Sequence, residues 1–153
     1  MKKVTGKKRK RVGWIVLLCI VGLLVLGMAG AVLAFEPGRR EAMDIVIDDV
    51  DFSRLKDGTY TGEYRGKKDN LRDTGVMVTI SGAEISDIRV VMGALANEKQ
   101  STDIRNGGTI NDLFARVMEH KSLQVDAISG ATITSKTHLK ALENALIKAQ
   151  QGK

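Results

Sequence analysis

Cysteine and histidine are nearly absent from this 153-residue sequence. The one cysteine, Cys19, lies within an apolar run, so the chain has no internal disulfide and no cysteine-based metal site. The two histidines, His120 and His138, have no second ligand at the spacing that metal-binding motifs require. We interpret both histidines as surface residues of their helices, and we predict no metal site and no catalytic residue.

Acidic residues are missing before position 36, whereas cations crowd the N-terminus. The seven cations before position 12 are Lys2, Lys3, Lys7, Lys8, Arg9, Lys10 and Arg11. Of the 24 Lys and Arg in the chain, 17 therefore remain from Glu36 onward, together with all 18 Asp and Glu. The high isoelectric point belongs to the basic tail, so the near-neutral remainder gives no reason to expect a nucleic-acid-binding domain.

Charge is also absent from Val12 to Phe35, an apolar run long enough to cross the hydrocarbon core of a bilayer as a helix. The cations before this run predict a cytoplasmic N-terminus, with the residues after the run outside. Trp14 and Phe35 lie near its two ends, as interfacial aromatic residues often do. A signal peptide cleaved near Val32-Leu33-Ala34 is the alternative, although the run exceeds the usual apolar core of a signal.

Four segments follow from these patterns: a basic cytoplasmic tail at 1–11, a transmembrane helix at 12–35, a linker and approach segment at 36–56, and an extracytoplasmic domain at 57–153. Pro37 and Gly38 are expected to end the membrane helix. The residues from 41 to 55 include apolar side chains, but their pattern does not distinguish helix from strand.

The first half of the outer domain has the pattern of a β-meander. Strands are predicted at Asp57–Tyr64, at Val76–Ile80 and at Glu84–Met92, with Ser81-Gly82 as the turn between the last two. The alternation of apolar and polar residues in the second and third strands indicates a sheet with one buried face.

Helical spacing replaces the alternation after Gly93. One helix is predicted at Asn111–Lys121, capped by Thr109 or Asn111, and a second at Ser135–Gln150. The second helix has an apolar stripe of Leu139, Leu142, Leu146 and Ala149. Val125–Ile128 is either a short strand or an extended approach. The predicted fold class is α+β, a small antiparallel sheet covered by helices and preceded by one N-terminal transmembrane helix.

Small hydroxyl residues cluster in DAISGATITS, from Asp126 to Ser135, directly before the expected terminal helix. Gly130 permits a tight turn, and the free N–H groups at a helix start favour an anion, so the stretch suits a phosphate beside Thr132. Neither Gly-x-Ser-x-Gly nor a Walker loop is present. An ordinary turn capped by the side chains of Asp126 and Ser129 is the alternative.

The same stretch resembles the flavinylation motif of the FMN-binding domain family, whose consensus is Asp-x-x-Ser/Thr-Gly-Ala-Thr. That family includes the G subunit of Rnf-type complexes, the C subunit of sodium-pumping NADH:quinone oxidoreductase and small membrane-anchored flavoproteins. DGTYTGEY, the hairpin VMVTISGAEISDIRVV and the pair Asn97-Glu98 extend the resemblance, which runs from Asp57 to Ala149. The chain lacks the long insertions of the larger members, which favours a stand-alone carrier.

The resemblance implies that FMN is bound covalently through its phosphate to Thr132. Thr134 is the alternative acceptor. The resemblance further implies that Asp126, Ser129, Gly130 and Ala131 serve recognition and positioning, while Thr134 and Ser135 cap the following helix against the phosphate. Tyr60, Tyr64 and Met92 are candidates to cover the isoalloxazine ring, although each is equally suited to the core.

The implied function is that of a single-span flavoprotein of the cell membrane that relays electrons between a membrane donor and an extracytoplasmic acceptor. No obvious base sits beside Thr132, so a separate flavin transferase that uses FAD and magnesium is expected to attach the FMN. The chain is then a carrier and a transferase substrate, with the lipid bilayer as a further partner. A small reductase that binds FMN non-covalently, and a cofactor-free accessory subunit of a membrane redox complex, remain the alternatives.

Overall fold

The computed structural model describes residues 6–152, so residues 1–5 of the predicted basic tail lie outside the described part of the chain. Helix α1 (Gly6–Met43) has a mean hydropathy of 2.9 in its most apolar stretch and is long and apolar enough to cross a membrane. Before Pro37, the described apolar side chains of α1 are exposed, among them Trp14 at 69 % and Leu26 at 71 %. The side chain of Phe35 is outside the described residues.

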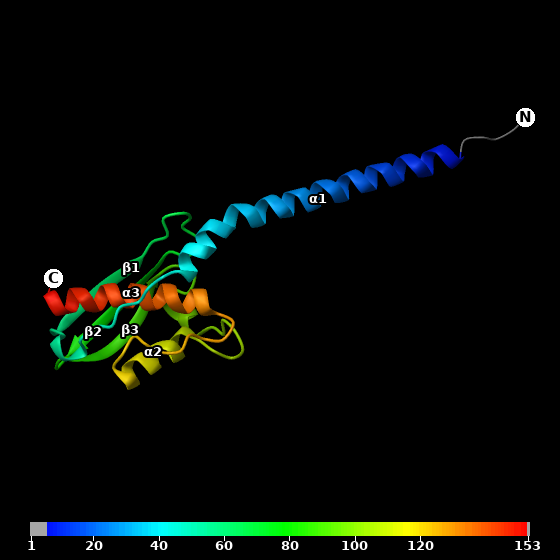
Figure 1. The fold of residues 1–153 in the computed structure, drawn as a ribbon. Coiled ribbons are helices and arrows are strands. Elements are labelled where there is room, and N and C mark those ends of the chain that lie inside the picture. Colours follow the sequence, from blue (N-terminus) through cyan, green and yellow to red (C-terminus); the bar gives the residue numbers. More distant parts are fainter. Residues whose placement is uncertain (1–5, 153) are drawn as a thin grey trace, which may run out of the picture. The chain divides into compact units, whose positions relative to one another are not determined.

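Helix α1 continues beyond Pro37, where the sequence was expected to end it (Figure 1). Proline already has a helical φ and removes only one backbone donor, so a helix can pass through it where packing supports the next turns. Such packing is present, because Ala42 is fully buried. In addition, the Glu41 carboxylate accepts hydrogen bonds from the backbone N–H groups of Lys67 (2.8 Å) and Lys68 (3.0 Å).

Residues from Gly38 onward form one compact unit built on a three-stranded antiparallel sheet in the order β1-β2-β3, as predicted. The strands are β1 (Gly58–Tyr64), β2 (Thr74–Ser81) and β3 (Glu84–Met92). Gly82 and Ala83 form the β2–β3 turn with positive φ angles of 66° and 62°. The Asp57 carboxylate accepts hydrogen bonds from the N–H groups of Ala83 and Gly82, which lower the pKa of that carboxyl and tie the start of β1 to this turn.

Four helical segments complete the domain: η1 (Phe52–Arg54), η2 (Asn97–Ser101), α2 (Ile110–His120) and α3 (Thr132–Gln151). Thr109 caps α2 as predicted, in a reciprocal capping box with Asp112. Helix α3 begins at Thr132, three residues before its predicted start. The Val125–Ile128 segment is extended but pairs with no strand, so it is an approach to α3 and not a strand.

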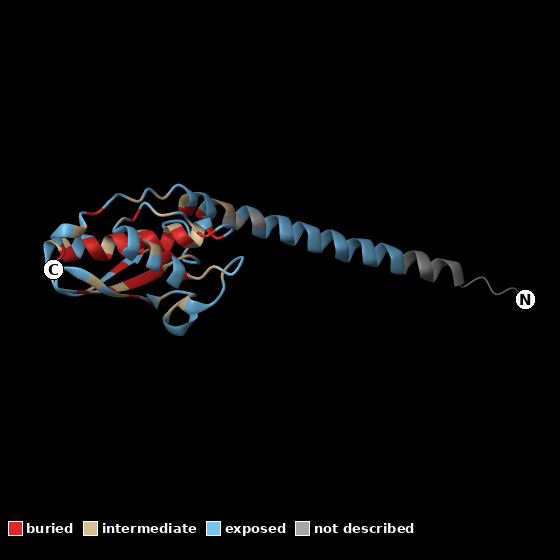
Figure 2. Cartoon of the chain, turned by 90° about the horizontal axis from the view of Figure 1, so that it is seen from below, coloured by how far each residue is buried: buried red, intermediate tan, exposed pale blue. Residues whose placement is uncertain are grey.

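Helix α3 covers one face of the sheet and makes the centre of the core (Figure 1). Figure 2 shows that buried residues concentrate along α3 and on the strands beneath it. The predicted stripe is confirmed, because Leu139, Leu142, Leu146 and Ala149 are all buried. Alternate strand residues and residues of α2 add much of the remaining core: Val76, Val78, Ile80, Ile88, Val90, Ile110, Leu113, Phe114 and Val117.

An extended segment after α1 runs along α3 and is held by polar side chains of that helix. Lys136 Nζ donates to the carbonyl of Met43 at 2.6 Å, at the end of α1. Farther along, the N–H of Asp48 donates to the buried Glu143 carboxylate at 3.3 Å, and Gln150 Nε2 donates to the carbonyl of Asp51 at 2.9 Å. Gln124 Nε2, outside α3, also donates to the carbonyl of Ile47 at 2.9 Å. These bonds explain why the segment has neither helical nor strand periodicity, because side chains of other elements hold it.

Sheet and helix approach each other closely at Gly62 of β1. A Cβ at this position would lie 2.2 Å from the carbonyl oxygen of Ala141 and 2.2 Å from the backbone nitrogen of Ala145. Both atoms belong to the backbone of α3, so they have no side-chain freedom with which to make room. Glycine at this position therefore allows α3 to lie directly on β1.

We predict that Gly62→Ala lowers the free energy of unfolding by about 1–3 kcal/mol, because the new methyl group overpacks the strand–helix contact. Urea unfolding followed by circular dichroism measures this change. Thr61→Ala, at the exposed neighbouring position, is the matched control and should cost less than about 1 kcal/mol. Equal losses in the two variants would contradict the close approach.

Candidate functional site

The predicted phosphate motif forms a tight turn followed directly by α3. In this Gly130 turn, residues 128–131, the N–H of Ala131 donates to the carbonyl of Ile128 at 2.9 Å. Gly130 has a φ of 78°, in the left-handed region that glycine adopts without strain. The sequence-based role of Gly130 in the turn is therefore confirmed.

Ser135 holds the Gly130 turn against α3. Its hydroxyl is fully buried, accepts from the N–H of Ile128 at 3.0 Å and donates to the carbonyl of Ala131 at 3.0 Å. Because α3 starts at Thr132, Thr134 and Ser135 lie inside its first turn, and the expectation that they cap the helix is wrong. Ala131 occupies the capping position and offers no side-chain hydrogen bond there.

The alternative of a turn capped by Asp126 and Ser129 is also wrong. Both residues are exposed, and within residues 6–152 neither side chain makes a recorded hydrogen bond. Only their backbone carbonyls are engaged: Arg116 Nη1 donates to that of Asp126 at 3.0 Å, and Asn106 Nδ2 donates to that of Ser129 at 3.4 Å. The two side chains are therefore available at the surface.

Thr132 is the first residue of α3 and is exposed. In the described part of the chain, no acceptor is recorded for the backbone N–H groups of Thr132, Ile133 and Thr134. Free donors and the helix dipole together give this end of α3 a partial positive charge. The Thr132 hydroxyl thus lies where an attached anion would be stabilised.

Arg105 adds a full positive charge beside the same turn. It precedes Asn106 and Gly107, whose positive φ angles of 53° and 79° form a tight turn. The Arg105 side chain lies across Gly130, since a Cβ on that glycine would be 2.7 Å from Arg105 Cγ and 3.2 Å from Nε. Its guanidinium has no recorded hydrogen bond or ion pair among the described residues.

Sequence reasoning did not find Arg105. The Asn106-Gly107 pair was the available signal, because this dipeptide favours a tight two-residue turn that would expose the residue before it. What the sequence could not show is that this turn packs onto the Gly130 turn. That contact joins two segments more than twenty positions apart.

A cavity of about 420 Å³, here called the α3 cavity, opens beside the first two turns of α3. Its lining combines apolar side chains with hydroxyl groups, one imidazole and one charge of each sign. The lining residues are Leu71, Arg72, Asp73, Thr74, Ala94, Leu95, Ile104, Ile133, Thr134, Thr137 and His138. Of the predicted site residues, Thr134 lines this cavity. Thr132 is not in the lining, but it directly precedes Ile133, which is.

His138 is buried in the wall of the α3 cavity with only 5 % exposure, so its expected surface position is wrong. His120, in contrast, is exposed as expected. Burial lowers the pKa of His138, and a hydrogen bond to the Thr134 carbonyl offsets this only in part. Helical spacing was an available signal, because His138 precedes the buried Leu142 by four residues and therefore shares its face of α3.

The three residues considered as ring contacts, Tyr60, Tyr64 and Met92, are not among those lining the α3 cavity. Tyr60 and Tyr64 are half-buried and pack against the core. Burial raises the pKa of Tyr64, with a smaller contribution from the nearby Glu41 carboxylate. Tyr60 and Tyr64 thus contribute to packing, and contact of the three residues with a flavin ring stays a prediction.

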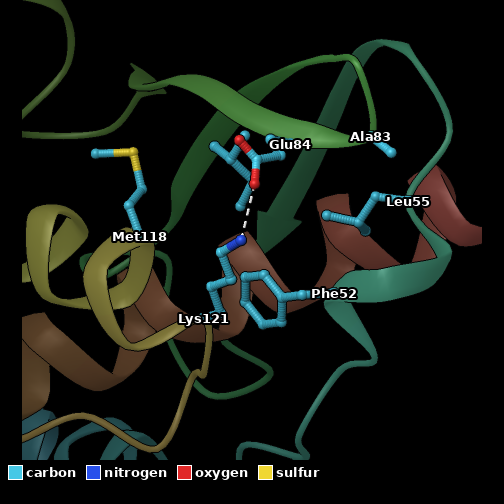
Figure 3. A pocket seen from close by; sticks show the side chains of 7 residues that line it. Phe52, Leu55, Ala83, Glu84, Met118 and Lys121 are labelled. Carbon is cyan, nitrogen blue, oxygen red and sulfur yellow. Dashed lines mark hydrogen bonds and ion pairs between the residues drawn. The ribbon is translucent and has the colours of Figure 1, made fainter.

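A second, smaller cavity of about 100 Å³ lies between η1, the β2–β3 turn and the end of α2 (Figure 3). It is lined by Phe52, Leu55, Ala83, Glu84, Ile85, Met118 and Lys121. Lys121 Nζ and Glu84 Oε1 form an ion pair of 2.8 Å within it, and this hydrogen bond lowers the pKa of Glu84. No residue of the Asp126–Ser135 motif lines this cavity, nor the cavity of about 530 Å³ along β3 and η2. Asp126 lines a fourth cavity of about 270 Å³ together with residues of α2. The α3 cavity is the candidate functional site because Ile133 and Thr134, which line it, directly follow Thr132.

We predict that Ser135→Ala lowers the free energy of unfolding by about 1–3 kcal/mol, because the buried N–H of Ile128 loses its acceptor. Urea unfolding checks this value. Ser129→Ala, in the same motif but exposed, is the control and should change stability by no more than about 0.5 kcal/mol. If the two variants were equally stable, Ser135 would not be the residue that holds the turn.

Comparisons with known proteins place this geometry in a family. The FMN-binding domain matches residues 71–147, about half of the chain, and this range includes Thr132, Arg105 and the lining of the α3 cavity. The CPE2226 protein of Clostridium perfringens, known from a crystal structure, is 27 % identical, with a TM-score of 0.49 over 65 % of this chain and 92 % of that one. No curated protein matches the chain. The domain match assigns a flavin-binding role in electron transfer, and the chain belongs to the FMN-binding domain family.

Proposed function

We propose that the protein is a membrane-anchored, extracytoplasmic electron carrier that holds FMN through a phosphoester on Thr132. The observation that carries this proposal is the exposed Thr132 at the first residue of α3, directly before Ile133 and Thr134 of the α3 cavity, in a chain of the FMN-binding domain family. A carrier of this kind needs a firmly held flavin and an exposed route for electrons, and it needs no catalytic residue of its own.

The residues around Thr132 fit the phosphate end of FMN. Three backbone N–H groups at the start of α3 have no recorded protein acceptor, and the helix dipole favours an anion there. The guanidinium of Arg105, beside Gly130, is suited to a charge-assisted hydrogen bond with a phosphate oxygen. Gly130 keeps space for that side chain, because a Cβ would collide with it.

The α3 cavity fits the ring end. Its volume of about 420 Å³ falls within the range of about 300–1,000 Å³ that is usual for small-molecule sites. Leu71, Leu95 and Ile133 offer apolar contacts, while Thr74 and Thr137 offer hydroxyl groups. The flavin supplies the electron chemistry, and these residues orient it and limit its contact with water.

Attachment requires help from outside the chain. The Thr132 hydroxyl has no recorded hydrogen-bond partner among the described residues, so nothing there is placed to remove its proton. We therefore assign the reaction to a magnesium-dependent flavin transferase: the pyrophosphate bond of FAD breaks, the phosphorus of its FMN half bonds to Thr132 Oγ1, and AMP leaves. The exposed Asp126 and Ser129, with Gly130 and Ala131 holding the turn, are the surface that such an enzyme would recognise.

Helix α1 supports the membrane part of the proposal. Seven cations precede the apolar stretch of the chain, five of them within the first turns of α1, and they favour a cytoplasmic N-terminus with the flavin domain outside, as in a single-pass protein of the cell membrane. A tether of this kind keeps the flavin at a fixed local concentration near a membrane donor, from which an extracytoplasmic acceptor collects the electrons. A reporter fused after Lys153 should be active outside the cytoplasm, and activity only inside would contradict the orientation.

The central test is covalent flavin on the chain expressed together with a flavin transferase. The wild type should gain the mass of FMN minus water and fluoresce in a denaturing gel, whereas Thr132→Ala should lose both signals. Thr134→Ala is the matched control and should retain them. Flavin that is released on denaturation would indicate a non-covalent reductase, and a chain without flavin would indicate a cofactor-free accessory protein.

Arg105→Gln is a second arm of the same experiment. One charge-assisted hydrogen bond contributes about 1.5–3 kcal/mol, which corresponds to roughly a 10- to 100-fold slower attachment when it is lost. Lys99→Gln removes an exposed cation from η2 and should leave the rate unchanged. An unaltered rate in Arg105→Gln would remove Arg105 from the phosphate site.

A further inference from the structure

His138 is the one group in the lining of the α3 cavity whose ordinary pKa lies near neutrality. Its imidazole is held in one tautomer by the geometry around it. Nδ1 lies 2.7 Å from the carbonyl oxygen of Thr134, and a carbonyl oxygen only accepts, so Nδ1 carries a proton and donates it. In the neutral imidazole, Nε2 is therefore an acceptor.

The Thr74 hydroxyl faces Nε2, and it can donate a hydrogen bond to Nε2 only if it gives up its hydrogen bond to the Met92 carbonyl. Thr74 Oγ1 lies 3.2 Å from His138 Nε2 and 3.1 Å from the carbonyl oxygen of Met92, and its hydroxyl has a single proton. Two acceptors thus compete for one donor while His138 is neutral. Once Nε2 carries a proton, it donates to Thr74, and Thr74 donates to Met92, so every group in this buried chain has a partner.

The charged groups that face His138 from other elements are Arg72 and Asp73, at the end of the β1–β2 loop. Each already has an opposite charge nearby: Arg72 Nη1 lies 3.3 Å from Asp69, and Asp73 lies 4.0 Å from Arg65. The lining residues from the β3–η2 connection and from the segment before α2, which are Ala94, Leu95 and Ile104, carry no charge. On α3 itself, Thr134 and Thr137 are the neighbours, and the dipole of the helix start disfavours a cation.

Two opposing effects therefore set the protonation of His138. Burial and the helix dipole favour the neutral imidazole, whereas the hydrogen-bond chain through Thr74 is complete only in the protonated form. The protonation of His138 therefore responds to charge that is added in the cavity. Negative charge gained inside a cavity with few compensating groups favours the cationic form of a base that faces it.

We propose that His138 takes up a proton when the flavin in the α3 cavity is reduced, so that electron uptake by this protein is coupled to proton uptake. The inference rests on the proposed function, because it requires FMN on Thr132 with its ring in the α3 cavity. An electron arrives from the external donor, and a proton from solvent bonds to Nε2, which turns the imidazole into imidazolium. Thr74 is the positioning residue that receives the new N–H.

Nuclear magnetic resonance of the ¹⁵N-labelled histidines in the full-length, flavin-loaded chain in lipid nanodiscs tests this directly. The chain has two histidines, and His120→Gln assigns their signals. In the oxidised protein at pH 7, His138 should show the neutral Nδ1–H tautomer and should protonate only below the ordinary value of about pH 6.5. After reduction with dithionite at pH 7, its two nitrogens should show the imidazolium signature.

Two variants separate this role from a structural one. Thr74→Val removes the acceptor for the new N–H, so a smaller fraction of His138 should be protonated after reduction. Thr132→Ala, treated with the same reductant, should show no change at His138. A flavin-loaded wild type in which His138 stays neutral in both redox states overturns the inference and leaves the proposed function intact. A wild-type chain that never acquires flavin overturns both.

Discussion

Helix α3 meets strand β1 backbone to backbone at Gly62, and this contact fixes the position of the elements that form the site. With no side chain between them, the helix cannot slide along the strand without a collision. Two residues farther along β1, Tyr64 pairs with Thr74 of β2, and the Thr74 hydroxyl faces His138 on α3. The contact at Gly62 also places the first turn of α3 beside the β1–β2 loop, whose residues form one wall of the α3 cavity.

The two ends of the candidate site are built by different physical means. The Gly130 turn is small and is already held by the Ser135 hydroxyl and by Asn106, so binding of an anion there would require little ordering of the chain. The α3 cavity is larger and mostly apolar, and it brings together segments from the β1–β2 loop, the region before α2 and α3 itself. The family match spans both ends.

The spacing of apolar residues was enough to predict the elements whose structure depends on neighbouring residues in the sequence. Period-two alternation predicted the second and third strands, a turn dipeptide before β-branched and aromatic residues predicted the first, and helical spacing predicted the buried stripe of α3. The predictions failed where contacts between residues distant in sequence determine the structure. Tertiary packing of Ala42 and Glu41 carries α1 past Pro37, the contact with Thr74 and the cavity wall bury His138, and the fold brings Arg105 to Gly130. None of these contacts joins residues near one another in sequence.

The Gly130 turn also bears on the order in which the protein matures. Ile128, Ala131 and Ser135 are buried, so the turn acquires its shape only when α3 has settled on the sheet, whereas Thr132 stays at the surface of the finished domain. A transferase that recognises this shape would, under the proposed chemistry, act on the folded domain. Under the proposed chemistry, an attached flavin would mark a chain whose folding is complete.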